Sequence, residues 1–246
     1  MSNEKISNII KNSLHIQIVI MSIAQRIHTI SQRISQYAED KPVTLLAMSK
    51  FQPVTAIREA YEAGLVNFGE NYWQDAKEKM NDLQELPLCW HFTGAIQSNK
   101  AAAITESMSW VHTVDREKIA FLLNDHRPTQ LPPLNVCIQV DLDQEHNKAG
   151  IDAAEVPALA QIIQQLPQLR LRGLMAIPKP RQLEEEQYQS LLRLKHLFDD
   201  INPHLSYTMD TLSMGMTDDL IPAIRAGSTM VRIGRAIFGE RQRGSR

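Results

Sequence analysis

The chain has 246 residues, of which 43% are hydrophobic and 22% are charged. This composition is that of a globular protein and argues against intrinsic disorder. The 26 Lys and Arg nearly balance the 28 Asp and Glu, and the formal net charge of -2 argues against nucleic-acid binding through bulk positive charge. We therefore expect a folded core and a small or uncharged partner.

The first predicted element is a helix that starts at residue 21, where Ile23, Ile27, Ile30 and Ile34 recur at helical spacing. The apolar run 14–24 just before it is interrupted by polar residues, lacks an A-x-A cleavage site and is too short to span a bilayer. The sequence therefore predicts a cytoplasmic protein without a membrane segment.

Eight short apolar runs then alternate with stretches of helical composition, which is typical of a parallel sheet. Eight such units in about 200 residues favour a single-domain (β/α)8 TIM-type barrel over an open doubly wound sheet. The helices between them include 55–63 and 115–124, with Thr55 and Asp115 as predicted caps. The predicted strands are 43–49, 66–69, 90–94, 110–114, 134–141, 171–177, 211–215 and 229–234.

Two cysteines lie inside these apolar runs, and the sequence contains neither a CxxC motif nor a Cys/His cluster with metal-ligand spacing. We expect Cys89 and Cys137 to be reduced core residues, which suits a reducing compartment, and we expect no metal site. His91 and His112 have no carboxylate neighbour in the sequence, and we interpret them as satisfied core or rim histidines.

A barrel of this type carries its functional groups where the strands end. Lys50 follows the first strand in alternation with Leu46 and Met48, which places its amine at the barrel mouth; a solvated lysine at a strand end is the alternative. An amine beside fixed cations in an apolar socket can attack a carbonyl and form a Schiff base. Asn71, which closes the second strand, is a further candidate contact.

The end of the chain offers binding groups for an anion. Residues 220–246 hold six arginines and one acid, and Arg232 lies within a strand, where a buried guanidinium needs a partner. In the string SMGMTDD, Ser213 and Gly215 close the seventh strand and Thr217 lies where a helix should start, while Gly234 ends the eighth strand. Glycine turns at helix starts bind phosphate. Strand eight neighbours strand one in a closed barrel, so an aldehyde-bearing phosphate such as pyridoxal phosphate fits all these groups.

Eight strings between about residues 21 and 241 together resemble the pyridoxal phosphate homeostasis proteins. They are AMSKFQP, NFGENYWQDAKEK, WHFTGAIQSNK, VHTVD, LNVCIQVDLDQEHNKAGI, LRGLMAIP, LSMGMTDD and AGSTMVRIGRAIFGER. The resemblance implies a barrel over residues 21–246 similar to the N-terminal domain of alanine racemase. It further implies a Schiff base on Lys50, an Arg232 contact to the pyridine nitrogen, phosphate contacts from the SMGM loop and the RIG turn, and a second amine, Lys148.

Two positions depart from the family pattern. Arg235 stands where the family usually has Ser or Thr, and we expect either a direct or water-mediated phosphate contact from it or a solvent-facing side chain. Residues 1–20 are surplus to the family's first helix, and we interpret them as a mis-set start codon, with an extra amphipathic arm as the alternative.

The function implied by the resemblance is that of a non-catalytic pyridoxal phosphate carrier that serves cofactor-dependent apo-enzymes. An Arg232 contact would keep the ring nitrogen unprotonated, which disfavours aminotransferase chemistry. Alanine racemase adds a β domain with a catalytic tyrosine, whereas seven residues follow Gly239 here, so we expect a monomer without the second base that racemisation needs. The alternatives are an amino-acid racemase and, less favoured, a Schiff-base aldolase.

Overall fold

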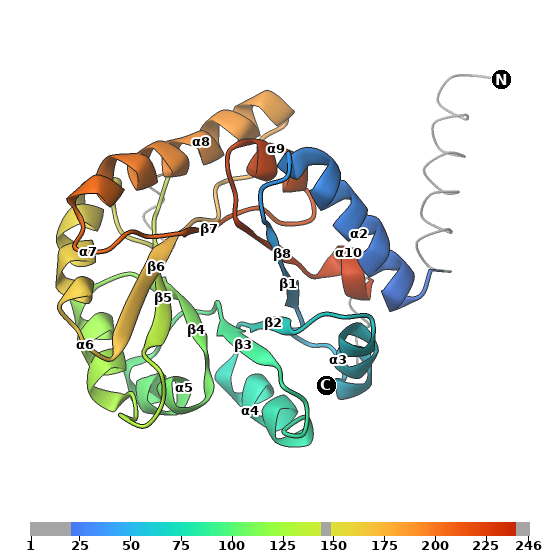
Figure 1. Cartoon of the computed structure of the whole chain (residues 1–246), viewed down its shortest axis with the longest axis horizontal. Helices are drawn as coiled ribbons and strands as arrows, with labels where there is room; N and C mark the ends of the chain where they lie inside the picture. The colour runs from blue at the N-terminus through green and yellow to red at the C-terminus, as the bar shows by residue number, and fades with distance from the viewer. Residues whose placement is uncertain (1–20, 144–148, 240–246) are drawn as a thin grey trace.

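The computed structural model describes residues 21–143 and 149–239 and contains eight parallel strands that close into one barrel (Figure 1). The seam between β1 and β8 is paired in register, with Leu46 opposite Arg232. The predicted (β/α)8 barrel is therefore confirmed, with strand ends shifted by a few residues. The strands are β1 Thr44–Met48, β2 Asn67–Glu70, β3 Cys89–Phe92, β4 Trp110–Val114, β5 Leu134–Gln139, β6 Leu169–Met175, β7 Thr211–Ser213 and β8 Met230–Ile233.

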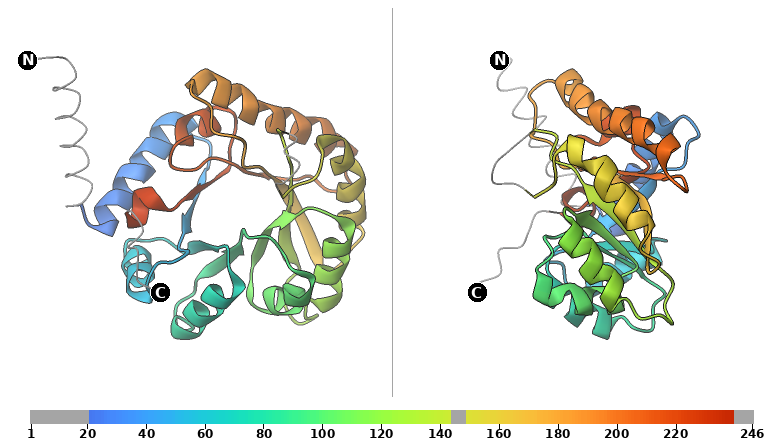
Figure 2. Two further views of the ribbon diagram at one scale, coloured as in Figure 1. Left: turned by 180° about the vertical axis from the view of Figure 1, so that it is seen from behind. Right: turned by 90° about the vertical axis from the view of Figure 1, so that its left-hand side faces the viewer.

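Helices form a ring around the strands, which Figure 2 shows from behind and from the side. In the described part of the chain, no helix is long and apolar enough to cross a membrane. The ring consists of α2 Ile23–Ala38, α3 Val54–Glu62, α4 Trp73–Asp82, α5 Ala101–Ser107, α6 Glu117–His126, α7 Val156–Gln164, α8 Glu184–Ile201, α9 Leu220–Arg225 and α10 Arg235–Phe238, with short 3-10 turns at Ser98–Lys100, Ala153–Glu155 and Asn202–His204.

The predicted helix before the first strand is confirmed as α2. Ser22 and Gln25 form a reciprocal capping box at its start, and Ile27, Ile30 and Ile34 are its buried face. Since α10 has only four residues, α2 covers the outside of the β1–β8 seam, where it packs on α9, α10 and α3. Arg26 on α2 donates to the Ile237 carbonyl at 3.0 Å. The interpretation of residues 1–20 lies outside the described residues and stays a prediction.

Two predicted helix caps are wrong. Helix α3 begins one residue before Thr55, with Pro53 as its N-cap, so the threonine lies inside the first turn. Helix α6 has Arg116 as its N-cap, and the Asp115 carboxylate accepts instead from the Arg116 guanidinium at 2.5 Å. Neither helix start has a hydrogen bond from its N-cap side chain.

Side chains alternate along each strand between the helices and the barrel interior. The inward set includes an apolar layer of Leu46, Trp110, Cys137, Met175 and Met230, which forms a core cluster separate from the one between sheet and helices. Both cysteines are free, and Cys137 is fully buried in this layer. Ser213 and Arg232, nearer the carboxyl ends of β7 and β8, are polar and buried.

Gly173 is required where β6 meets β7. A Cβ atom at this position would lie 1.6 Å from the Thr211 carbonyl oxygen of the neighbouring strand. We expect Gly173→Ala to push the two strands apart and to lower the free energy of unfolding by about 3 kcal/mol. Gly64→Ala is the control, because a Cβ atom there has no neighbouring atom within 4 Å. That substitution should cost only the strain of an alanine in a left-handed backbone conformation, about 1 kcal/mol. Urea unfolding measures both values, and equal losses would contradict the prediction.

Candidate functional site

A cavity of about 680 Å³ opens at the carboxyl ends of β1, β7 and β8. It joins the residues that the sequence assigned to two distant segments, because the β1–β8 seam brings them together. Lys50 is half-buried at its edge. The lining residues are Met48, Lys50, Gln52, Met216, Thr217, Asp218, Arg232, Gly234, Arg235 and Gly239.

Arg232 contributes a buried cation to this cavity. Its guanidinium donates to the Ser213 carbonyl at 2.5 Å, to Ser213 Oγ at 2.8 Å and to the Ala176 carbonyl at 3.0 Å. These acceptors are all neutral. Burial lowers the pKa of Arg232 to about 10, and attraction to Asp219 opposes the shift. The guanidinium therefore remains cationic at neutral pH, which suits an electron-rich or anionic ligand.

The backbone just before Lys50 is tied to a second, buried lysine. Lys79 of α4 donates from Nζ to the Ser49 carbonyl at 2.7 Å and to Glu70 Oε1 at 2.8 Å. Ser49 Oγ donates to the same Glu70 oxygen at 2.6 Å. Because Lys79 is only 4% exposed and already paired, Lys50 is the lysine offered to the cavity.

The backbone just after Lys50 is held from the same helix. Asp75 Oδ2 accepts from Lys79 Nζ at 2.8 Å and from the Phe51 N–H at 3.1 Å. Phe51 has a φ of 63°, a left-handed conformation that a bulky residue adopts only when its surroundings impose it. The sharp turn that presents Lys50 at the mouth is thus fixed on both sides.

Glu70 should make stability depend on pH. Burial raises its pKa from 4.5 to about 7, although attraction to Lys79 lowers it. The folded protein therefore binds more protons than the unfolded chain in this range, so the free energy of unfolding should fall as pH rises from about 4.5 to 7. Glu70→Gln should flatten this decline, and Glu78→Gln, on the exposed face of α4, should leave it unchanged. Urea titrations at both ends of the range measure the slope, and an equal decline in all three proteins would contradict the assignment.

The loop after β7 and the turn after β8 face each other across the cavity. Thr217 and Gly234 line it, and a Cβ atom at Gly234 would lie 3.3 Å from Met48, so the cavity floor is close-packed there. Gly215 has a φ of +95° and lets the loop turn back over Ala223. Arg235 is paired with Asp218, at 2.5 and 2.7 Å, and is half-exposed.

Three predicted site residues in the described part of the chain do not line the cavity: Ser213, Gly215 and Asn71. Ser213 is fully buried below it, and its hydroxyl contacts Arg232 and His112. Asn71 lies at the rim after β2, where its Oδ1 accepts from Thr93 at 3.0 Å. Lys148 is outside the described residues. The prediction that His91 and His112 are satisfied core histidines is confirmed, since both are buried and hydrogen-bonded.

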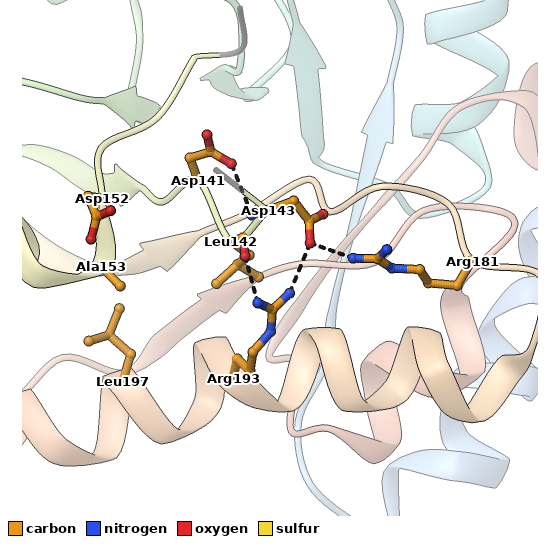
Figure 3. A pocket seen from close by; sticks show the side chains of 8 residues that line it. All are labelled: Asp141, Leu142, Asp143, Asp152, Ala153, Arg181, Arg193 and Leu197. Atoms are coloured by element: carbon orange, nitrogen blue, oxygen red, sulfur yellow. Dashed lines mark hydrogen bonds and ion pairs between the residues drawn. The ribbon is translucent and has the colours of Figure 1, made fainter. Parts of the chain in front are cut away.

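A second cavity, of about 570 Å³, lies between the loop after β5 and α8 (Figure 3). Asp143 accepts there from Arg181 at 2.5 Å, from Arg193 at 2.9 Å and from the Lys179 N–H at 2.6 Å. Burial would raise the pKa of Asp143, but these donors lower it. The cluster was not predicted from the sequence, because its members lie far apart in the chain. These contacts tie the loops after β5 and β6 to α8.

The fold and the first cavity place the chain in a known class. The family model described as alanine racemase, N-terminal domain, matches residues 20–242. The alanine racemase of Corynebacterium glutamicum has a TM-score of 0.67 at 15% identity, over 87% of this chain and 59% of that chain. That likeness shows the fold alone. The protein is thus a barrel of the alanine racemase N-terminal class.

Relatives define the family within this class. The pyridoxal phosphate homeostasis protein of Pseudomonas aeruginosa is 51% identical over 229 residues, 91% of this chain and 98% of the relative, and that of Escherichia coli K12 is 49% identical over 81% of this chain and 86% of the relative. PipY of Synechococcus elongatus, solved with pyridoxal phosphate bound, has a TM-score of 0.79 and 34% identity, over 89% of this chain and 100% of that chain. The chain belongs to the pyridoxal phosphate homeostasis protein family.

Proposed function

We propose that this protein binds pyridoxal phosphate in the cavity at the β1–β8 seam and serves vitamin B6 homeostasis as a carrier without catalysis of its own. The observation that carries the proposal is the convergence of Lys50, Arg232 and two glycine turns on one cavity. Its volume lies within the ~300–1,000 Å³ typical of small-molecule sites. The names of the relatives and the PipY complex support the same ligand.

The residues fit the chemical groups of this cofactor. Lys50 would hold its aldehyde carbon, and Arg232 would donate to its ring nitrogen. Thr217, Gly234 and the backbone after Gly215 would hold its phosphate. When bound, the cofactor supplies an aldehyde that condenses reversibly with amines and a ring that accepts electrons. Arg232 offers an N–H donor and not a carboxylate that would accept a proton from the ring nitrogen. It therefore leaves that nitrogen unprotonated and the ring a weak electron sink. Contacts from Asn71 and Lys148 stay predictions, as does a phosphate contact from Ser213, whose hydroxyl is used elsewhere.

Arg235 provides a test of the phosphate side. Its guanidinium is held by Asp218 beside the cavity, so a bound phosphate would compete with a carboxylate for it. We expect Arg235→Ala to weaken pyridoxal phosphate binding a few-fold, since exposed ion pairs contribute about 0–1 kcal/mol, and to leave pyridoxal binding unchanged. Asp218→Asn releases the guanidinium and should strengthen phosphate binding by a similar factor. Spectroscopic titrations with both ligands measure this, and equal losses for the two ligands would refute the contact.

The remaining parts of the proposal concern the setting of the protein. The two free cysteines support a reducing, cytoplasmic compartment. We also propose a monomer that hands the cofactor to dependent apo-enzymes. Size-exclusion chromatography with light scattering tests the first point, and a dimer would overturn it. Activation of a purified apo-enzyme by the loaded protein faster than by free cofactor tests the second, and equal rates would refute direct transfer.

One titration separates the carrier from its rivals. The purified protein should develop a visible absorption band with pyridoxal phosphate and should not catalyse deuterium exchange at the α-carbon of added amino acids. Sustained exchange would indicate a racemase, which needs a base on each face of the substrate. A colourless protein that cleaves a sugar phosphate would indicate a Schiff-base aldolase. Either result would overturn the proposal.

A further inference from the structure

A chain of hydrogen-bonded side chains crosses the barrel interior and ends on Arg232. The guanidinium is 2.8 Å from Ser213 Oγ, which is 2.8 Å from His112 Nδ1. His112 Nε2 is 3.0 Å from His91 Nδ1, and His91 Nε2 is 3.1 Å from Asn67 Oδ1. The chain thus joins β8, β7, β4, β3 and β2, and its serine and both histidines are fully buried.

The two ends of the chain determine where its protons lie. Arg232 can only donate, so Ser213 Oγ accepts from it and keeps its own proton to give. Asn67 Oδ1 can only accept, so His91 carries its proton on Nε2. Because a neutral imidazole has one N–H, His91 Nδ1 must accept from His112 Nε2, and His112 Nδ1 must accept from the Ser213 hydroxyl. Every proton then meets an acceptor.

The surroundings of the rings favour their neutral forms. Burial lowers the pKa of His91 to about 3 and the pKa of His112 well below its usual value, and the charge of Arg232 adds to the second shift. Trp110 stacks on the His91 ring with centroids 5.3 Å apart, and Cys89 Sγ lies 3.4 Å from its Nε2. Among these contacts of the described residues, Arg232 is the charged group, so protonation of either ring would add a second buried cation.

We propose that Ser213, His112 and His91 are positioning residues, which hold the Arg232 guanidinium against the cavity through a neutral chain whose hydrogen bonds all run in one direction. Two other hydrogen bonds of Arg232 go to backbone carbonyls, so within the described residues Ser213 of the chain supplies its side-chain acceptor. A hydroxyl that gives its proton to His112 turns its lone pairs toward the guanidinium. Arg232 is then kept as a donor toward the ligand ring. The inference deepens the proposed function and depends on it for the ligand.

The first test uses the protein without added ligand. Nitrogen-15 NMR of the histidine side chains should show two rings in the Nε2–H tautomer that do not titrate between pH ~5 and 8, the range in which an unperturbed histidine changes charge. Ser213→Ala removes the donor to His112 Nδ1 and should shift that nitrogen most. An Nδ1–H signal from His112, or titration of either ring in this range, would overturn the proton assignment whether or not the protein binds the cofactor.

The second test connects the chain to the ligand. Ser213→Ala should weaken pyridoxal phosphate retention about tenfold and shift the visible band of the bound cofactor. Ser213→Thr, which keeps a hydroxyl, should restore both. Ser190→Ala is the matched control, because that buried serine also accepts from an arginine, at 3.0 Å, but on α8. Urea unfolding confirms that each variant is folded. Normal retention and an unshifted band in folded Ser213→Ala would refute the positioning role, whereas no binding by the wild type would refute the proposed function instead.

Discussion

Lys50→Ala should abolish covalent capture of pyridoxal phosphate. The Lys50 amine lines the cavity, and its backbone is held on both sides by Lys79 and Asp75. A nucleophile held in this way is oriented before the ligand arrives, which lowers the entropic cost of bond formation. We expect the visible band to disappear and borohydride reduction to leave no adduct, while weak noncovalent binding through the phosphate and Arg232 persists.

Two controls make the Lys50 experiment decisive. Lys118→Ala, on the exposed face of α6, should retain the full band. Mass spectrometry of the reduced, digested wild type should find the adduct on the peptide that contains Lys50 and not on the one that contains Lys79, whose amine is buried and paired. An adduct that persists in Lys50→Ala would move the attachment point elsewhere, with Lys148 as the first residue to examine.

Arg232→Gln should separate retention of the cofactor from stability of the fold. The substitution removes bonds from a charged donor, each worth about 1.5–3 kcal/mol, but it also removes a cation whose burial lowers its pKa to about 10. Since a buried charge can be replaced by a neutral group at little net cost, we expect a change of only about 1–2 kcal/mol in the free energy of unfolding. A lost bond to the ligand ring, worth about 1.5–3 kcal/mol, should weaken retention roughly ten- to hundredfold.

The control for Arg232 is Arg225→Gln. Arg225 lies on α9 with its side chain 44% exposed and pairs with Glu184, so we expect retention and stability close to those of the wild type. Arg241, in the same basic stretch of sequence, lies outside the described residues. Dialysis of the loaded proteins followed by absorbance measures retention, and similar losses in both variants would show that Arg232 does not contact the ligand.

Much of the fold was predictable, because the pattern that specifies it is local. Runs such as 110–114 are apolar and β-branched over the length of one strand, and eight of them alternate with helices. The cavity could be predicted because closure of the barrel puts Lys50 beside Gly234, although no long-range signal in the sequence links the two residues. The wrong cap predictions at Thr55 and Asp115 show the limit of local rules, since a proline and an arginine occupy those N-cap positions instead.

The supports of the site were harder to predict. Asp75 and Lys79 stand four residues apart on one helix, a spacing that could have indicated their ion pair, but nothing local linked them to Ser49. The chain from Arg232 to Asn67 draws on five different strands, so its members come together only in the finished barrel. The sequence indicated that the hydrogen bonds of the two histidines would be satisfied, but it did not indicate which residues would be their partners.

The β1–β8 seam has a consequence for biosynthesis. Its two strands are the first and the last of the barrel to leave the ribosome, so a nascent chain carries Lys50 long before Arg232 is translated. Contacts between such remote segments form late and slow the folding of a domain. The cavity at the seam is therefore incomplete until β8 has been translated, and a chain that stalls before that point exposes Lys50 without the rest of the cavity lining.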